Sequence, residues 1–222
     1  MDLHSENLEP SERVGAKSFE RLEQALREGS RRASITGVRG GARGYLLARL
    51  ARGGIGPFVC VTADEEEAET LASDLELFLG AGTPEAPTVL RLPADSQLPY
   101  DVLSPDRRTV QARLAALFHL AHGAPARALV VSARALARRY LPAELFESRC
   151  ELVGAEQQID RDVLAARLVA MGYQSVPIVE DPGTFAVRGG ILDVFSPLYG
   201  KPVRLEFFGD LVESLQIGRA HV

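Results

Sequence analysis

Short apolar runs alternate with stretches of helical periodicity through the first 132 residues. The apolar runs have the length and composition of strands: Ala33–Gly37, Phe58–Thr62, Val89–Leu92 and Ala128–Ser132. Leucine and alanine recur at three- and four-residue spacing in the segments between them, which predicts the helices Gly44–Arg52, Asp64–Leu79 and Arg107–Ala121. This order predicts an α/β domain with a mostly parallel sheet covered on both faces.

The pattern changes after Leu141-Pro142. One more helix is predicted at Asp160–Met171, and short strands separated by Gly, Pro and Ser follow it: Val176–Val179, Thr184–Arg188, Ile191–Phe195 and Val203–Phe208. These elements predict a small α+β domain. We therefore divide the chain into a flexible N-terminus (1–18), the α/β domain (19–147), the small domain (148–216), which we expect to be incomplete at its C-terminal end, and a separate tail (217–222).

Composition restricts the environment and the partners. With 46% hydrophobic residues the chain can fill a core, and its formal net charge of -5 disfavours nonspecific nucleic-acid binding by the whole chain. Cys60 and Cys150 lie far apart without a CxxC spacing, which indicates a reducing compartment. The N-terminus lacks the features of a signal peptide, and no apolar segment approaches membrane-spanning length, so we expect a cytoplasmic protein with no membrane contact.

A glycine-rich segment lies where a phosphate-binding loop would be, between the first predicted strand and the first predicted helix. It contains Gly37, Gly40, Gly41, Ala42, Arg43 and Gly44. A working loop reads G-x-x-x-x-G-K-[ST], because the lysine binds the terminal phosphates and the hydroxyl binds magnesium. Counting from Gly37, Ala42, Arg43 and Gly44 occupy the last three positions. We interpret the segment as a degenerate loop without catalysis, although an arginine could still contact a phosphate.

Two further groups resemble metal sites. Asp64–Glu67 follows a predicted strand as magnesium-binding acids do, but acids are expected at a helix start, and Asp64 with Glu67 has the spacing of a capping box. His119 and His122 lie one turn apart with no third ligand in view. We predict no metal site and no cofactor in this chain.

Two blocks of sequence resemble bacterial transcription-repair coupling factors. The first contains Leu98–Asp101, Ser104-Pro105 and the helix with Arg107, Arg113 and Leu114. The second and more specific block is Asp181–Pro197, followed by Val203–Asp210. The excision-repair protein UvrB shares these blocks, but UvrB has an intact phosphate loop and an aromatic-rich hairpin. Here the loop has no lysine, and Tyr100 is the only aromatic residue between Leu92 and Phe118, so the coupling factor is the better match.

The resemblance implies that this chain belongs to a large ATP-driven translocase on double-stranded DNA, which displaces stalled RNA polymerase and recruits UvrA. It implies a degenerate, helicase-like P-loop domain here, with ATP and magnesium used by a motor elsewhere in the parent protein. The small domain corresponds to the family's UvrA-docking module. An alternative is a UvrB-type subunit whose loop binds nucleotide through Arg43. A weaker alternative is a DNA-binding platform that uses Arg107, Arg108 and Arg113.

Strand alternation predicts which side chains of the small domain face a partner. In Val203–Phe208, one face carries Val203, Leu205 and Phe207, and the other carries Arg204, Glu206 and Phe208. By motif match, the family implies UvrA contacts for Arg188, Arg204 and Phe208. The alternative is that Phe208 is a core residue and that Arg204 pairs with Glu206 or Asp210.

The six residues Ile217–Val222 do not continue the family pattern. They match one reading frame of ATCGGAAGAGCACACGTC, a common sequencing-library adapter. We therefore expect the natural sequence to run only to about Gln216.

Overall fold

The computed structural model describes residues 16–82, 88–94, 106–123 and 126–218. The helices are α1 (Ala16–Arg27), α2 (Ala42–Arg52), α3 (Glu65–Leu79), α4 (Arg107–Ala121), α5 (Ala133–Leu136), α6 (Ala143–Glu147) and α7 (Arg161–Ala170). The strands are β1 (Phe58–Thr62), β2 (Val89–Leu92), β3 (Ala128–Ser132), β4 (Gln174–Ser175), β5 (Thr184–Arg188), β6 (Ile191–Val194), β7 (Val203–Phe208) and β8 (Leu211–Ile217). Leu98–Asp101 and Ser104-Pro105 lie outside the described residues. Within the described ranges, no helix is long and apolar enough to cross a membrane.

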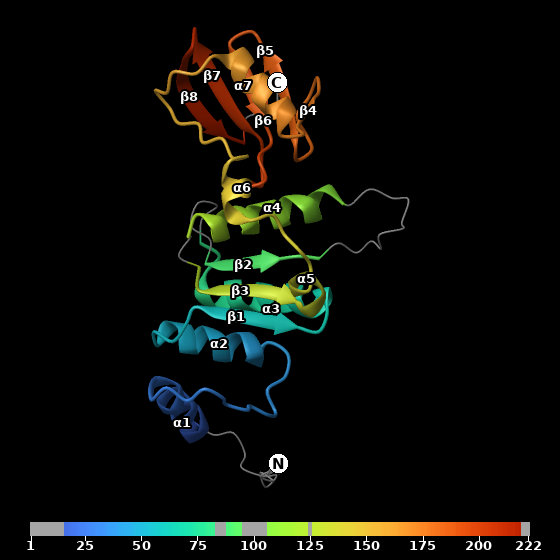
Figure 1. Cartoon of the computed structure of the whole chain (residues 1–222). Coiled ribbons are helices and arrows are strands. Elements are labelled where there is room, and N and C mark those ends of the chain that lie inside the picture. The colour runs from blue at the N-terminus through green and yellow to red at the C-terminus, as the bar shows by residue number, and fades with distance from the viewer. Residues whose placement is uncertain (1–15, 83–87, 95–105, 124–125, 219–222) are drawn as a thin grey trace.

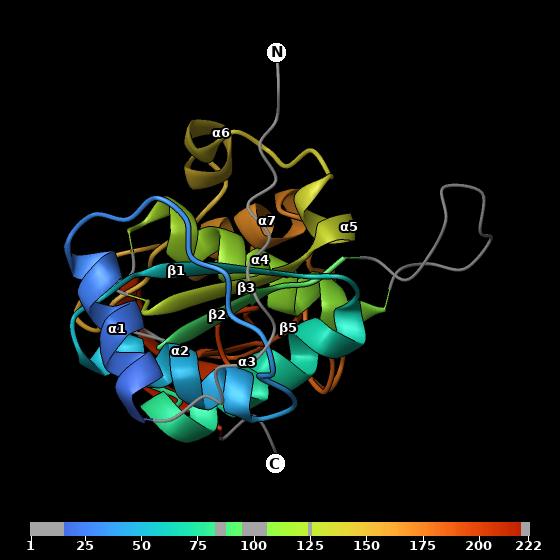
Figure 2. The same cartoon turned by 90° about the horizontal axis from the view of Figure 1, so that it is seen from below.

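The first domain is built on a parallel sheet with strand order β1-β3-β2, as expected for alternating strands and helices. Helices α2 and α3 lie on one side of this sheet and α5 on the other (Figures 1 and 2). The side toward α3 holds a core that includes Leu75, Val89 and Val130. The opposite side holds a second core with Leu92, Ala116 and Val131. The predicted α/β architecture is therefore present.

The predicted strand Ala33–Gly37 is wrong, because these residues are not part of a strand. Ile35 is the only large apolar side chain in this run, and 46% of it is exposed. A single large side chain buries too little apolar surface to hold the segment in the sheet. The glycine-rich segment is therefore preceded by irregular backbone, which differs from the strand–loop–helix arrangement of a phosphate loop.

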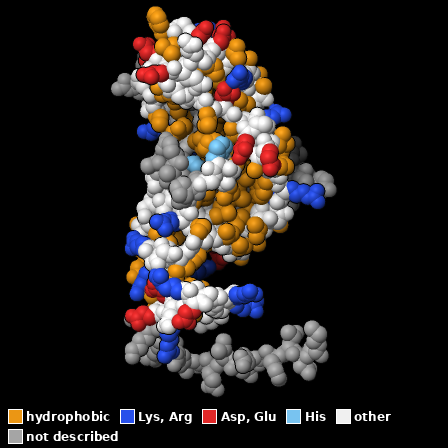
Figure 3. All heavy atoms as spheres, turned by 60° about the vertical axis from the view of Figure 1, so that its left-hand side comes forward, with side chains coloured by type: hydrophobic (Ala, Val, Ile, Leu, Met, Phe, Trp, Pro, Cys, Tyr) orange, Lys and Arg blue, Asp and Glu red, His pale blue; other side chains and the backbone are white. Residues whose placement is uncertain are grey.

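Strand β1 departs from the expectation that both faces of the sheet are covered. Phe58 and Cys60 pack toward α3, whereas Val59 and Val61, on the other face, are 65% and 52% exposed. Hydrophobic side chains also gather visibly over the middle of the molecule in Figure 3. The parallel sheet is thus covered on both faces at β3 but open on one face at its β1 edge.

The second domain is a five-stranded sheet with order β4-β5-β6-β7-β8, antiparallel except for the β4–β5 pair. Helix α7 begins at the N-cap Asp160, whose carboxylate accepts hydrogen bonds from the main chains of Asp162 and Val163. Its Leu164 and Leu168 pack against the inner face of the sheet, in a core that includes Phe185 and Leu192. This is the predicted small α+β domain.

Two strands differ from the prediction. The segment Val176–Val179 is not a strand; the short β4 at Gln174–Ser175 precedes it. Pro177 has no amide hydrogen for a ladder, and Val179 is instead fully buried against Ala186 and Phe195. Strand β8 was missing from the sequence prediction. It follows a tight turn at Gly209-Asp210 and pairs along β7, ending with Ile217 opposite Val203.

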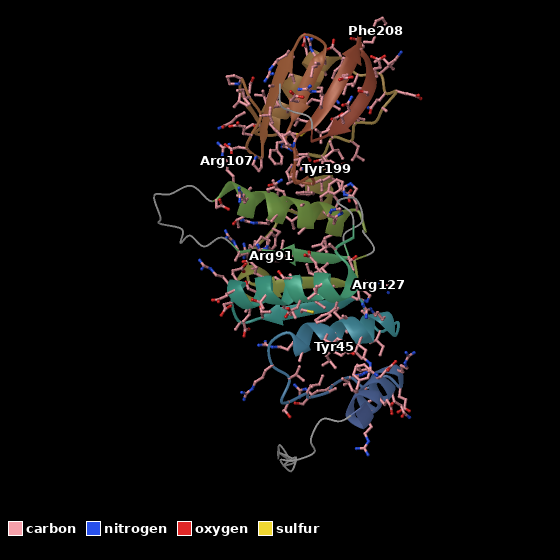
Figure 4. The ribbon with its side chains drawn as sticks, turned by 180° about the vertical axis from the view of Figure 1, so that it is seen from behind. Tyr45, Arg91, Arg107, Arg127, Tyr199 and Phe208 are labelled. Atoms are coloured by element: carbon pink, nitrogen blue, oxygen red, sulfur yellow. The ribbon has the colours of Figure 1, made fainter. Side chains whose placement is uncertain are left out.

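Polar contacts join the two domains at helix α4. The side-chain amide of Gln111 donates to the carbonyl oxygen of Tyr199 at 2.9 Å. Arg107 donates to the side-chain oxygen of Gln174 at 3.0 Å and lies 4.0 Å from the Asp181 carboxylate. Figure 4 shows Arg107 and Tyr199 at this junction. Arg107, one of the three arginines of the DNA-binding alternative, is thus engaged at the junction between the domains.

Candidate protein-docking site

The outer face of the second sheet carries the predicted docking residues. The inner face is occupied by Leu205 and Phe207, which pack in the α7 core. On the opposite face, Asp193 lies directly across from Arg204, and Ile191 lies across from Glu206. Arg188 on β5 is paired with Ile191. The structure therefore brings residues from β5, β6 and β7 together on one surface.

Phe208 is the most exposed large apolar side chain of this surface. It is the last residue of β7, pairs with Leu211 and is 78% exposed. Figure 4 shows it at the end of the second domain that is farthest from the first. Its neighbour Phe207 packs against the core cluster. The alternation of the two faces was predicted correctly, and the alternative that Phe208 is a core residue is wrong.

A close contact between two backbones holds this end of β7 in place. The amide of Phe207 donates to the carbonyl oxygen of Gly190 at 2.7 Å. A Cβ atom on Gly190 would lie 2.9 Å from the carbonyl oxygen of Phe207, so only glycine fits there without a shift. The turn after β5 and the end of β7 are therefore fixed against each other.

Arg204 pairs with Asp193 and not with Glu206 or Asp210, the two partners considered in the alternative to docking. Its guanidinium binds both carboxylate oxygens of Asp193, from Nε at 2.8 Å and from Nη2 at 3.0 Å. Hydrogen bonding to Asp193 raises the pKa of Arg204 above its usual value. Glu206 instead accepts a hydrogen bond from the hydroxyl of Ser214 at 2.9 Å. The pairing could have been found from the β6–β7 register, which places Asp193 opposite Arg204.

Arg188 ends β5 and lies on the same outer face. Its guanidinium donates to the carbonyl oxygen of Pro177. This bond ties β5 to the segment that follows β4. All three predicted docking residues thus lie on one face, with Phe208 projecting and both arginines held by contacts within the domain.

The glycine-rich segment has a different geometry from a phosphate loop. Gly44 lies inside α2, where a Cβ atom would come 2.5 Å from the Cβ of Asp74 on α3. Gly41 faces the carboxylate of the same aspartate, whose oxygens lie 3.7 Å from an added Cβ. Gly44 therefore permits close packing of the two helices, which agrees with a structural role for this glycine, whereas Gly41 is only at ordinary contact distance. Gly37 and Gly40 have positive φ angles of 79° and 52°.

The surroundings of this segment are acidic. Arg43 lies 3.6 Å from the carboxylate of Glu67 in an exposed ion pair. The hollow beside it is also lined by Asp64, Glu66 and Asp74. Four carboxylates around one guanidinium repel a phosphate chain. The side chains present here do not fit a nucleotide.

The groups that resembled metal sites have ordinary structural roles. Asp64 accepts a hydrogen bond from the amide of Glu67 at 2.8 Å, so the predicted cap is confirmed. Glu67 accepts a hydrogen bond at 3.4 Å from the amide of Ala63 and not from that of the N-cap residue Asp64, so the return bond differs from that of a capping box. His119 is buried, and His122 stacks on Phe118 with 4.1 Å between ring centroids. In the part of the chain that the structure describes, no three His, Cys, Asp or Glu residues are placed to hold a metal ion.

Comparison with known proteins agrees with the fold of the second domain. The family described as the UvrB interaction domain matches residues 153–220. A transcription-repair-coupling factor from Myxococcus xanthus is 53% identical over 214 residues, which are 96% of this chain and 18% of that protein. Those from Bacillus subtilis and Escherichia coli are 32% and 30% identical and cover 89% and 80% of this chain. The chain spans less than a fifth of each of these relatives. It belongs to the transcription-repair-coupling factor family and contains a UvrB interaction domain.

Proposed function

We propose that this chain is the part of a coupling factor that recruits UvrA, through the outer face of the β4–β8 sheet. The observation that carries the proposal is the exposure of Phe208, which is 78% accessible on a face that also holds Arg188 and Arg204. Phe208 has the highest exposed fraction among the large apolar side chains of the described residues. Aromatic residues and arginines dominate the binding energy of protein interfaces. The match to a UvrB interaction domain supports a protein partner from excision repair.

The proposed chemistry of the interface is burial of the Phe208 ring beside fixed positive charge. Phe208 contributes apolar area that only a partner can cover. The two arginines contribute hydrogen-bond donors toward carboxylate or carbonyl oxygens of UvrA. Because contacts within the domain already hold both arginines, binding loses less side-chain entropy than it would with free side chains.

Catalysis is not part of the proposed role of this chain. The acidic lining around Arg43 and the packing of Gly44 against α3 argue against ATP binding at the degenerate loop. We propose that the parent protein translocates on double-stranded DNA, displaces RNA polymerase and uses ATP and magnesium in a motor outside this chain. Titration of the chain with labelled ATP and magnesium tests the loop, and saturable binding would favour the UvrB-type alternative.

UvrA binding by the Phe208→Ala variant tests the docking proposal. Loss of an interface anchor of this kind costs about 2 kcal/mol or more, or roughly thirtyfold in Kd. Leu77→Ala is the matched control, because Leu77 is 77% exposed but lies on α3 of the first domain. The control should bind UvrA with unchanged affinity. Equal affinity of Phe208→Ala and the unaltered protein would refute the docking face.

A further inference from the structure

Asp193 is a buried carboxylate on the face that the UvrA proposal uses. Only 1% of this residue is exposed, although it points to the outer side of the sheet. Asp193 is paired across the β5–β6 ladder with Ala186, on which Val179 of the segment after β4 packs. A carboxylate without water needs a charged partner, and Arg204 is that partner.

The contact with Asp193 fixes the orientation of the Arg204 guanidinium as well as the position of its charge. Nε and Nη2 of Arg204 bind different oxygens of the carboxylate, so the planar guanidinium lies in one orientation. A guanidinium has five N–H donors, and Asp193 takes two of them. The contact with Asp193 therefore fixes the directions of the remaining N–H groups of Arg204, whose side chain is 14% exposed.

Stability alone is a weak explanation for this buried pair. Well-packed hydrophobic residues often replace a buried ion pair without loss of stability. The same strand carries Glu206, which is held by a neutral hydroxyl rather than by an arginine. The bidentate Asp193–Arg204 pair is thus a more specific arrangement than the packing of this face requires.

We propose that Asp193 is a positioning residue for recognition of UvrA. It holds the guanidinium of Arg204 so that its free donors meet a carboxylate or main-chain carbonyl oxygen of UvrA beside the ring of Phe208. This inference rests on the proposed function of the face. It adds a residue that does not itself touch the partner and that acts only through Arg204.

The test is a set of double-mutant cycles in the full-length protein, with the Kd for UvrA as readout. Asp193→Asn keeps the shape of the side chain and removes its charge. We expect it to weaken binding about tenfold, as expected for loss of a charge-assisted hydrogen bond. Arg204→Lys should weaken binding about tenfold alone, but less than about twofold when Asp193→Asn is already present. Phe208→Ala should have the same effect in both backgrounds.

Glu206→Gln is the matched control, because Glu206 lies on the same strand face and is held by Ser214. It should change the Kd less than Asp193→Asn does. Thermal unfolding of each variant shows whether the domain remains folded. If the Asp193→Asn variant does not fold, the UvrA affinity of the Arg204→Lys variant alone is the test. Lysine keeps a positive charge near Asp193 but cannot form the bidentate contact with its carboxylate.

Several results would overturn the inference. An affinity unchanged by Asp193→Asn, or by Arg204→Lys when it decides alone, would show that the orientation of Arg204 is not used. If Arg204→Lys weakens UvrA binding by the same factor with and without Asp193→Asn, the orientation of Arg204 is likewise not used. If Asp193→Asn also reduces the effect of Phe208→Ala, Asp193 loosens the whole face and is structural. Unchanged binding by Phe208→Ala, in contrast, would overturn the UvrA proposal itself.

Discussion

Arg43 in the first domain and Arg204 in the second each pair with a carboxylate, and the two pairs differ in burial and in geometry. In the first domain, Arg43 and Glu67 are 3.6 Å apart with half-exposed side chains, at the edge of an acidic hollow. In the second, Arg204 and Asp193 share two hydrogen bonds, and the aspartate is buried. Solvent weakens the first pair, whereas the second is shielded from it. For these two ion pairs, the arginine with the buried partner is the one that is held in a single orientation.

Breaking the buried pair should have the largest effect on stability. Asp193→Ala leaves the Arg204 guanidinium without its counter-charge in a poorly hydrated place, which we expect to cost about 3 to 5 kcal/mol of unfolding free energy. Urea unfolding of the protein measures this cost. The double variant Asp193→Leu with Arg204→Met removes both charges and should recover most of it. A loss below about 1 kcal/mol for Asp193→Ala would show that the two pairs are alike.

Replacing Gly44 tests the packing explanation of the degenerate loop. An added Cβ meets the Cβ of Asp74 at 2.5 Å, and such overpacking costs about 1 to 3 kcal/mol. Helix propensity alone predicts the opposite sign, because alanine is favoured over glycine by about 1 kcal/mol inside a helix. Gly41→Ala is the matched control, since its new Cβ would meet Asp74 only at ordinary contact distance, 3.7 Å. Stabilisation by Gly44→Ala in thermal unfolding would exclude close packing as the reason for this glycine.

Removing the exposed pair should have the smallest effect. Arg43→Ala deletes an ion pair whose partners are half exposed, and such pairs contribute about 0 to 1 kcal/mol. The difference in unfolding free energy between the variant and the unaltered chain should be small at low salt and smaller at high salt, because salt screens an exposed pair. A loss as large as that of Asp193→Ala would mean that Arg43 has a role in the loop that these contacts do not explain.

Local sequence signals predicted much of this structure. Helix α4 was predicted with its bounds as observed, Arg107–Ala121, and the Asp64–Glu67 cap was predicted from its spacing. Strand alternation separated Phe207 from Phe208 because a strand places neighbours on opposite faces. These features depend on residues that are close in sequence.

Features that depend on contacts between distant segments were missed. The burial of Asp193 was not predicted, and the partner of Arg204 depends on strand register. The requirement for Gly44 arises from the path of α3, thirty positions further along the chain. The short run Ala33–Gly37 looked like a strand, but its small side chains bury too little surface to be held in the sheet. The adapter origin of residues 217–222 remains a prediction, and residues 219–222 lie outside the described ranges.

On β7, Phe207 packs in the core and Phe208 is exposed, and we propose that Phe208 contacts UvrA. The most direct test measures UvrA affinity and thermal unfolding for Phe207→Ala and Phe208→Ala in the full-length protein. We predict that Phe207→Ala lowers the stability of the second domain by about 3 kcal/mol, because it leaves a gap in the α7 core. Phe208→Ala should change stability by no more than about 0.5 kcal/mol and should weaken UvrA binding strongly. The account would be contradicted if the Phe208→Ala variant unfolded while the Phe207→Ala variant stayed folded and lost UvrA binding.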